Sequence, residues 1–147
     1  MEIRQATFED MKGLLDLGET AFEESPYYKR FTQDFARQYK VIVACLQDPG
    51  TAIFVCDDFS GVLIGHITQQ PWFVEPIAEN DLFYIKPEVR GSSRALRLLE
   101  AFEAWAVGKG VRHYSVSVSS GIQTDKTAGF LEKLGFEPNG LMFVKEL

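Results

Sequence analysis

The 147-residue chain carries 15 Lys and Arg against 21 Asp and Glu, which gives a net charge of −6. An acidic chain disfavours nucleic-acid binding and is compatible with cationic partners. With 46% apolar and 24% charged residues, the composition predicts one globular domain over residues 1–147. No apolar run reaches the about 20 residues of a membrane helix, so no membrane association is expected.

The two cysteines, Cys45 and Cys56, lack the spacing of a metal or redox motif. They predict free thiols in a reducing compartment. The first residues lack the basic and apolar regions of a signal peptide. Both features lead us to expect a cytoplasmic protein.

The first half of the chain alternates strand and helix patterns. Thr7 and Asp10 have the spacing of a helix start, and an apolar stripe follows them. Pro26 interrupts that helix. The expected elements are a strand at 3–6, a helix from 7, a helix at 32–46, a hairpin of strands 51–56 and 62–69, and a loop at 71–80.

The second half repeats the alternation. Pro87 should end its strand, because proline has no N–H to donate. The expected elements are a strand at 81–86, a helix at 93–108, a strand at 112–119, a helix at 124–134 and a final strand at 141–144. Strands interleaved with helices predict an α/β (α+β) fold with a mixed sheet covered by helices.

The segment 84–95 is the most informative part of the chain. It predicts a strand, a tight polar turn and the first turn of a helix. Such a turn directs several backbone N–H groups at one point, and this point lies at the positive end of a helix dipole. Both features favour the binding of an anion there, most often a phosphate.

This segment resembles motif A of the GNAT superfamily of N-acetyltransferases. Arg90 opens the motif, Ser93 occupies the first glycine position, and Ala95 occupies the last. Residues 130–138, with the pair Gly135-Phe136, resemble motif B of the same superfamily. The resemblance implies a mixed, mostly antiparallel sheet with a splayed fourth and fifth strand, flanked by about four helices.

The resemblance also implies acetyl-coenzyme A as co-substrate, no metal, and an amine-bearing acceptor that is cationic. Dimers are common in the superfamily, so a homodimer is a further expectation. Residues at the end of the fourth strand and in the following turn would hold the cofactor. They are Phe83, Tyr84, Ile85, Arg90, Gly91, Ser92, Ser93, Arg94 and Ala95. Ser93 adds a hydroxyl and is a favourable helix cap.

Transfer to an amine needs a general base and donors for the developing oxyanion. Glu79 and Asp81 are the candidate bases, with Glu75 behind them, and the Tyr84 backbone is the candidate oxyanion donor. The tyrosine that supplies the acid in many relatives is replaced by Leu131. One alternative is that Tyr84, Tyr114, Ser117 or Ser119 acts as the general acid. The other is that the thiolate leaves without an acid, because a thiol pKa of about 8.5 makes its departure only mildly costly.

Two segments with aromatic and acidic residues, 22–28 and 72–75, suit an amine or lysine side chain, and packing alone explains them equally well. His66 and His113 lack partners at ligand spacing and are expected to be structural. The leading hypothesis is an N-acetyltransferase that uses direct attack in a ternary complex. The alternative is a GNAT-fold module that binds acyl-coenzyme A without turnover. An enzyme acting on aminoacyl-tRNA is disfavoured by the acidic charge.

Overall fold

The computed structural model describes residues 1–147 and divides into two compact units. The first holds residues 1–21 and 33–117, and the second holds residues 22–32 and 118–147. A single domain over the whole chain therefore stays a prediction. The elements are β1 (Ile3–Gln5), α1 (Met11–Glu24), α2 (Phe35–Gln47), β2 (Thr51–Cys56), β3 (Gly61–Gln69), β4 (Pro76–Ile85), α3 (Arg94–Gly108), β5 (His113–Ser115) and α4 (Thr124–Lys133).

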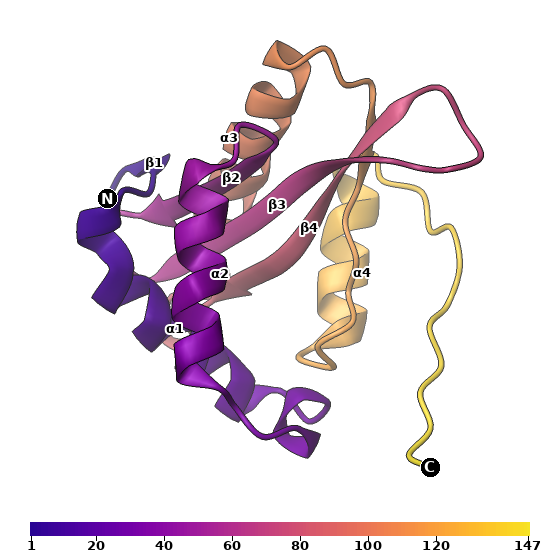
Figure 1. Ribbon diagram of the computed structural model, residues 1–147. Coiled ribbons are helices and arrows are strands. Elements are labelled where there is room, and N and C mark those ends of the chain that lie inside the picture. The colour runs from indigo at the N-terminus through magenta and orange to yellow at the C-terminus, as the bar shows by residue number, and fades with distance from the viewer. The chain divides into compact units, whose positions relative to one another are not determined.

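The first unit contains one five-stranded sheet whose strands follow chain order, β1-β2-β3-β4-β5 (Figure 1). The first three pairings are antiparallel, and β4 pairs with β5 in parallel. The predicted hairpin of β2 and β3 is confirmed, with Thr51 opposite His66. This mixed sheet matches the expected fold class.

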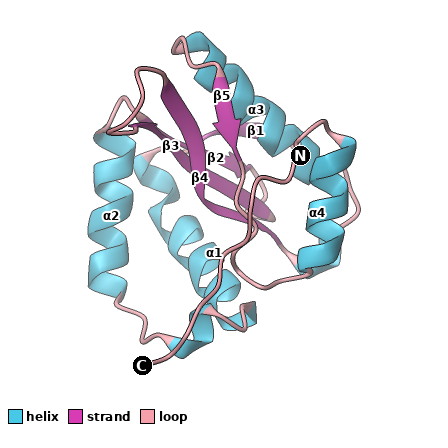
Figure 2. Cartoon of the chain, turned by 90° about the vertical axis from the view of Figure 1, so that its right-hand side faces the viewer, coloured by secondary structure: helices cyan, strands magenta, loops and turns pink.

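Helices cover both faces of this sheet. Figures 1 and 2 show α1 and α2 on one face and α3 on the other. Apolar side chains of the helices and strands form the core, because each fully buried one contributes about 1.5–3 kcal/mol. The most deeply buried are Leu17, Val55, Val62, Leu63, Leu98 and Phe102.

Several predicted boundaries differ from the structure. β4 begins at Pro76 rather than at 81, which places Glu79 inside the strand and not in the preceding loop. The first residue of a strand tolerates proline. β5 covers only three residues of the predicted 112–119. α2 begins at Phe35, because the Asp34 carboxylate accepts a hydrogen bond from the Arg37 amide at 3.0 Å.

The second unit contains α4 and the segment 22–32. The Ser25 hydroxyl is fully buried and donates to the carbonyl of Ser120. The predicted final strand at 141–144 is wrong, since residues 134–147 form no strand. Leu141 and Phe143 are 85% and 87% exposed. A run of apolar residues forms a strand only where another strand edge pairs with it, and none does so here.

No helix in the chain combines the length and the apolar character that crossing a bilayer requires.

Candidate functional site

The turn between β4 and α3 is built by residues 86–93. β4 ends at Ile85, before Pro87 as the sequence predicts, and Pro87 opens a single 3₁₀ turn. Gly91 has φ +83°, a left-handed conformation that glycine adopts without a steric cost. The Arg90 Nε donates to the Ile85 carbonyl at 2.9 Å, and its guanidinium lies over the Tyr84 ring at 5.6 Å. These contacts hold the turn against the end of the strand.

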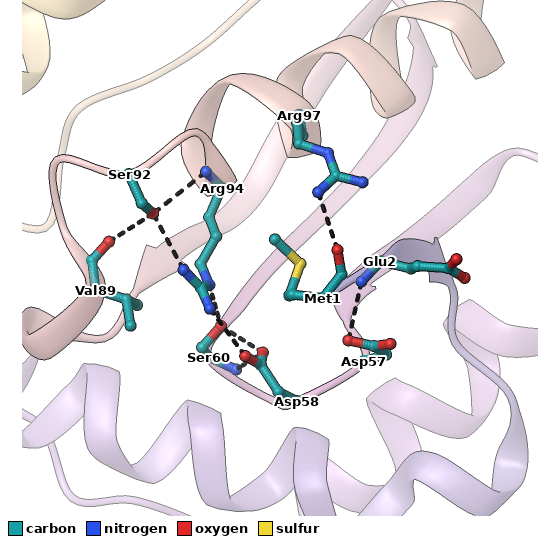
Figure 3. Close-up of polar contacts among 9 residues, drawn as sticks. All are labelled: Met1, Glu2, Asp57, Asp58, Ser60, Val89, Ser92, Arg94 and Arg97. Carbon is teal, nitrogen blue, oxygen red and sulfur yellow. Dashed lines mark hydrogen bonds and ion pairs between the residues drawn. The ribbon is translucent and has the colours of Figure 1, made fainter.

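Arg94 joins this turn to the turn between β2 and β3 (Figure 3). Its Nε donates to the Ser60 hydroxyl at 2.8 Å, and its Nη2 lies 3.0 Å from the Asp58 carboxylate. The Ser60 hydroxyl and the Arg94 guanidinium lower the pKa of Asp58 to about 2, against an opposing effect of burial. Arg94 is thus an anchor of the turn in this structure, and the sequence did not indicate its partners.

Ser93 is the residue before α3, but its side chain makes no capping hydrogen bond. The expected cap is therefore wrong. The Ser92 hydroxyl instead donates to the Val89 carbonyl at 2.7 Å and lies 3.4 Å from the Arg94 amide. The amides of Gly91 and Ser93 donate to no other group of the chain. Together with the first-turn amides of α3, they are donors of the kind that bind phosphate.

β4 and β5 separate after a short pairing. Only Ile77, Ala78 and Glu79 of β4 pair with β5, whereas β3 pairs with β4 as far as Ile85. At the point of separation, the Asn80 Oδ1 accepts from the Ser117 amide at 2.8 Å. The Asn80 side chain thus takes the place of a neighbouring strand, and β5 does not pair with β4 beyond this point.

A β-bulge lies at the same position. Ile64 is opposite Leu82 and Gly65 is opposite Asn80, so Asp81 is the extra residue of β4. Bulges redirect side chains and are common beside active sites. The bulge aims the Asp81 carboxylate at His66, whose Nδ1 lies 2.8 Å from Oδ2. The His66 Nε2 lies 3.3 Å from the Glu79 Oε1.

The structure therefore brings the two candidate bases, Glu79 and Asp81, to one histidine. Sequence reasoning treated His66 as a structural residue, and it also missed Asn80. The signal that could have identified His66 is that pairing the two neighbouring strands places an acid, Glu79, opposite this histidine. Glu75 lies in the tight turn before β4 and is exposed, together with Trp72 and Phe73.

The candidate proton donors differ in burial. Tyr84 is 4% exposed and lies opposite Val62. Burial and the negative charge of Glu103 raise the pKa of Tyr114, which disfavours its ionised form. The Ser117 hydroxyl lies 3.3 Å from the Asn80 Oδ1. Leu131, at the usual tyrosine position, is buried and has no proton to give.

Residues 10–136 match the model of the Acetyltransferase (GNAT) family. The chain belongs to the GNAT acetyltransferase family. A curated relative, the amino-acid acetyltransferase of Vibrio cholerae serotype O1, is 28% identical over 131 residues. This match covers 89% of the chain but only 27% of the relative, so the chain spans about a quarter of that protein's length.

Several solved structures have the same fold. A protein from Bacillus halodurans, solved as a tetramutant, has a TM-score of 0.80 at 17% identity, covering all of both chains. The aminoglycoside 6′-N-acetyltransferase of Acinetobacter haemolyticus has a TM-score of 0.73 at 17% identity, covering 100% of this chain and 99% of the other. An aminoglycoside N-acetyltransferase in complex with coenzyme A has a TM-score of 0.74 at 18% identity, covering 99% of both chains.

The GNAT chain contains no group of three His, Cys, Asp or Glu side chains that could hold a metal ion.

Proposed function

We propose that this GNAT protein is an acetyl-coenzyme A-dependent N-acetyltransferase that acts on a primary amine. The observation that carries the proposal is the turn at 90–95, which presents the Gly91 and Ser93 amides at the N-terminus of α3, beside the part of β4 with which β5 does not pair. Family membership supports the same function. An aminoglycoside N-acetyltransferase of similar fold was solved with coenzyme A.

The pyrophosphate is proposed to bind the turn formed by Arg90, Gly91, Ser92, Ser93, Arg94 and Ala95. Its negative charge is favoured by the α3 dipole and by the backbone N–H groups. Arg94 already pairs with Asp58, so its charge at the phosphates is partly balanced. The amides of Gly91 and Ser93 are therefore the primary contacts in this proposal.

The pantetheine arm is proposed to lie along β4 at Phe83, Tyr84 and Ile85. Its amides can lie alongside β4 beyond Glu79, where β5 no longer pairs with this strand. The buried Tyr84 side chain fixes this part of the strand. The register pairs the Tyr84 backbone with Val62 of β3, so the backbone N–H of a neighbour of Tyr84 is our candidate for stabilising the oxyanion that forms on the acetyl carbonyl.

Glu79 and Asp81 are the proposed bases. Both project from β4 near the place where it separates from β5, and both contact His66. A carboxylate that accepts the ammonium proton makes the acceptor nitrogen nucleophilic. Direct attack in a ternary complex then needs no covalent enzyme intermediate.

The acceptor is proposed to be a cationic amine. Negative charge at Glu79 and Asp81 favours such a group, and the exposed Trp72 and Phe73 suit contact with a cation. The names of the relatives point to two kinds of acceptor, amino acids and aminoglycosides. Both kinds carry primary amines.

Thiol release from acetyl-coenzyme A tests this function. The purified chain is assayed with amino acids, aminoglycosides, polyamines and basic peptides. Acceptor-dependent release supports the proposal. Binding of acetyl-coenzyme A without release across the whole panel would favour the alternative, an acyl-coenzyme A sensor, which the apolar Leu131 also suits.

A further inference from the structure

His66 lies between the two candidate bases on the neighbouring strand. Its Nδ1 is 2.8 Å from Asp81 Oδ2, and its Nε2 is 3.3 Å from Glu79 Oε1. Glu79 is directly opposite His66 in the antiparallel register, and Asp81 is the residue added by the bulge. Nδ1 is therefore hydrogen-bonded to Asp81, and Nε2 lies within ion-pair distance of Glu79.

These three side chains belong to the sheet face that α2 covers. A Cβ on Gly65 would lie 2.4 Å from Phe102 of α3, so Gly65 faces α3 and its neighbour His66 faces the opposite side. Burial, followed by the charges of Asp81 and Asp48, raises the pKa of Cys45 on α2. Cys45 and Asp48 are thus the titratable groups that α2 and the residue after it bring near the cluster.

The cluster is open to solvent and to an incoming amine. The side chains of His66, Glu79 and Asp81 are 32%, 36% and 50% exposed. Partial exposure allows a proton to leave toward water. A structural histidine that only joined two strands would not need two acids at its two nitrogens.

The number of protons in the cluster limits its hydrogen bonds. A neutral imidazole has one N–H, so it can donate to Glu79 or to Asp81 but not to both. One additional proton makes the ring a cation that donates to Asp81 and forms an ion pair with Glu79 at once. The proton that a general base takes from its substrate would therefore let His66 interact favourably with both carboxylates.

We propose that His66 is a positioning residue that takes the substrate proton from Glu79. This inference rests on the proposed N-acetyltransferase function. The acceptor ammonium gives one proton to the Glu79 carboxylate, and Glu79 passes it to Nε2 while Nδ1–H stays bonded to Asp81. The acceptor nitrogen then bonds to the acetyl carbon, and the C–S bond breaks. The sulfur leaves with the electron pair and takes the second nitrogen-bound proton, and His66 releases its proton to water.

His66→Gln distinguishes this role from a structural one. Glutamine keeps a donor and an acceptor at similar reach but cannot carry a proton. With an acceptor from the thiol-release panel, we expect kcat to fall about 10–100-fold, within the range of general acid–base catalysis. The melting temperature and the KM for acetyl-coenzyme A should stay close to those of the wild type.

Chemical rescue and a matched control sharpen the test. Added imidazole should restore part of the kcat lost in His66→Ala, because it supplies the missing proton acceptor. His113→Gln changes a histidine at the start of β5 that contacts neither acid, and it should leave kcat unchanged. Wild-type kcat in His66→Gln, with an unchanged pH profile, overturns the inference.

The two proposals fail in different ways. An active wild type whose His66→Gln variant is equally active defeats the role of His66 and leaves the acetyltransferase standing. A wild type that is silent across the panel defeats the acetyltransferase and the proton transfer together. In ¹⁵N-labelled protein, each ring ¹⁵N signal of His66 should respond to one acid, Nε2 to Glu79→Gln and Nδ1 to Asp81→Asn. If neither signal responds, the inference is overturned without reference to turnover.

Discussion

The guanidinium of Arg94 and the carboxylate of Asp58 form an ion pair of 3.0 Å that joins the first residue of α3 to the turn between β2 and β3. Ser60 completes the contact by accepting from the Arg94 Nε. The phosphate-binding turn proposed here is therefore held by residues about thirty-five positions earlier in the chain. Its shape depends on a hairpin that has no part in the motif itself.

Removing the ion pair should reveal a coupling energy. Asp58→Ala and Arg94→Ala should each destabilise the chain, and their double variant should lose less than the sum. We expect a coupling of about 0.5–1 kcal/mol in urea unfolding, because Asp58 is partly exposed. Asp57→Ala, which loses only a bond from the Glu2 amide, is the control. Additive effects of Asp58 and Arg94 would show that the ion pair contributes nothing.

Acid should weaken the fold through Asp10. Two hydrogen bonds from Arg4, followed by the one from the Thr7 amide, lower the pKa of Asp10 from 3.8 to about 2. A lowered folded-state pKa gives stability that is complete above about pH 4 and is lost as the pH falls toward 2. Asp10 is 8% exposed, so the loss should reach at most about 2 kcal/mol.

Asp10→Asn checks this pH dependence. The variant should be less stable than the wild type at pH 7 and should lose less further stability between pH 4 and 2. Urea unfolding at several pH values measures both effects. Equal slopes for the wild type and Asp10→Asn across this range would contradict the assignment.

Gly65→Ala should destabilise the first unit. Its Cβ would lie 2.4 Å from the Phe102 Cζ and 2.8 Å from the Glu79 carbonyl, and neither neighbour is the end of a flexible chain. Such overpacking costs about 1–3 kcal/mol. The Glu79 backbone should move as well, so thiol release should fall with stability.

Gly108→Ala is the matched control, since no atom lies within 4 Å of its Cβ. Alanine at this position in α3 should be neutral or stabilise the chain by up to about 1 kcal/mol. Thermal unfolding of both variants compares them directly. Wild-type stability in Gly65→Ala would mean that Phe102 is not packed against the sheet at this point.

Acetyl-coenzyme A should raise the melting temperature, because it binds only the folded state. At a hundred times its Kd, the gain of about 2.7 kcal/mol corresponds to roughly 5–10 °C for a chain of this size. Ser93→Glu should abolish the shift by placing a carboxylate where the pyrophosphate is proposed to bind. Val107→Glu adds the same charge on an exposed site near the far end of α3 and should keep the shift. A melting-temperature shift that persists in Ser93→Glu would show that the pyrophosphate does not bind at this turn.

Asn80→Leu should weaken cofactor binding. The variant loses the bond to the Ser117 amide that holds the two strands apart at a fixed distance. A loss of about 1 kcal/mol corresponds to a five- to tenfold higher Kd for acetyl-coenzyme A by calorimetry. Asn139→Leu, in the segment after α4, should leave the Kd unchanged. An unchanged Kd in Asn80→Leu would show that the hydrogen bond between Asn80 and Ser117 does not contribute to cofactor binding.

Local patterns predicted most of the fold. The apolar stripe of α3 and the alternation of β2 and β3 depend on neighbours within one element, so the chain specifies them before it folds. Pro87 ends β4 for the same local reason. The prediction of a strand at 141–144 was wrong, because a strand also needs the edge of another strand to pair with, and no local pattern supplies one.

The sequence by itself determined the turn at 90–95, its place after a strand and before a helix, and the family to which these motifs belong. Only the tertiary structure decided what the charged groups do. Pairing of β3 with β4 and the bulge at Asp81 brought His66 to two acids, and the hairpin at Asp58 reached Arg94. Such contacts depend on strand register and on the direction of side chains across a sheet, which are fixed only when distant segments pair.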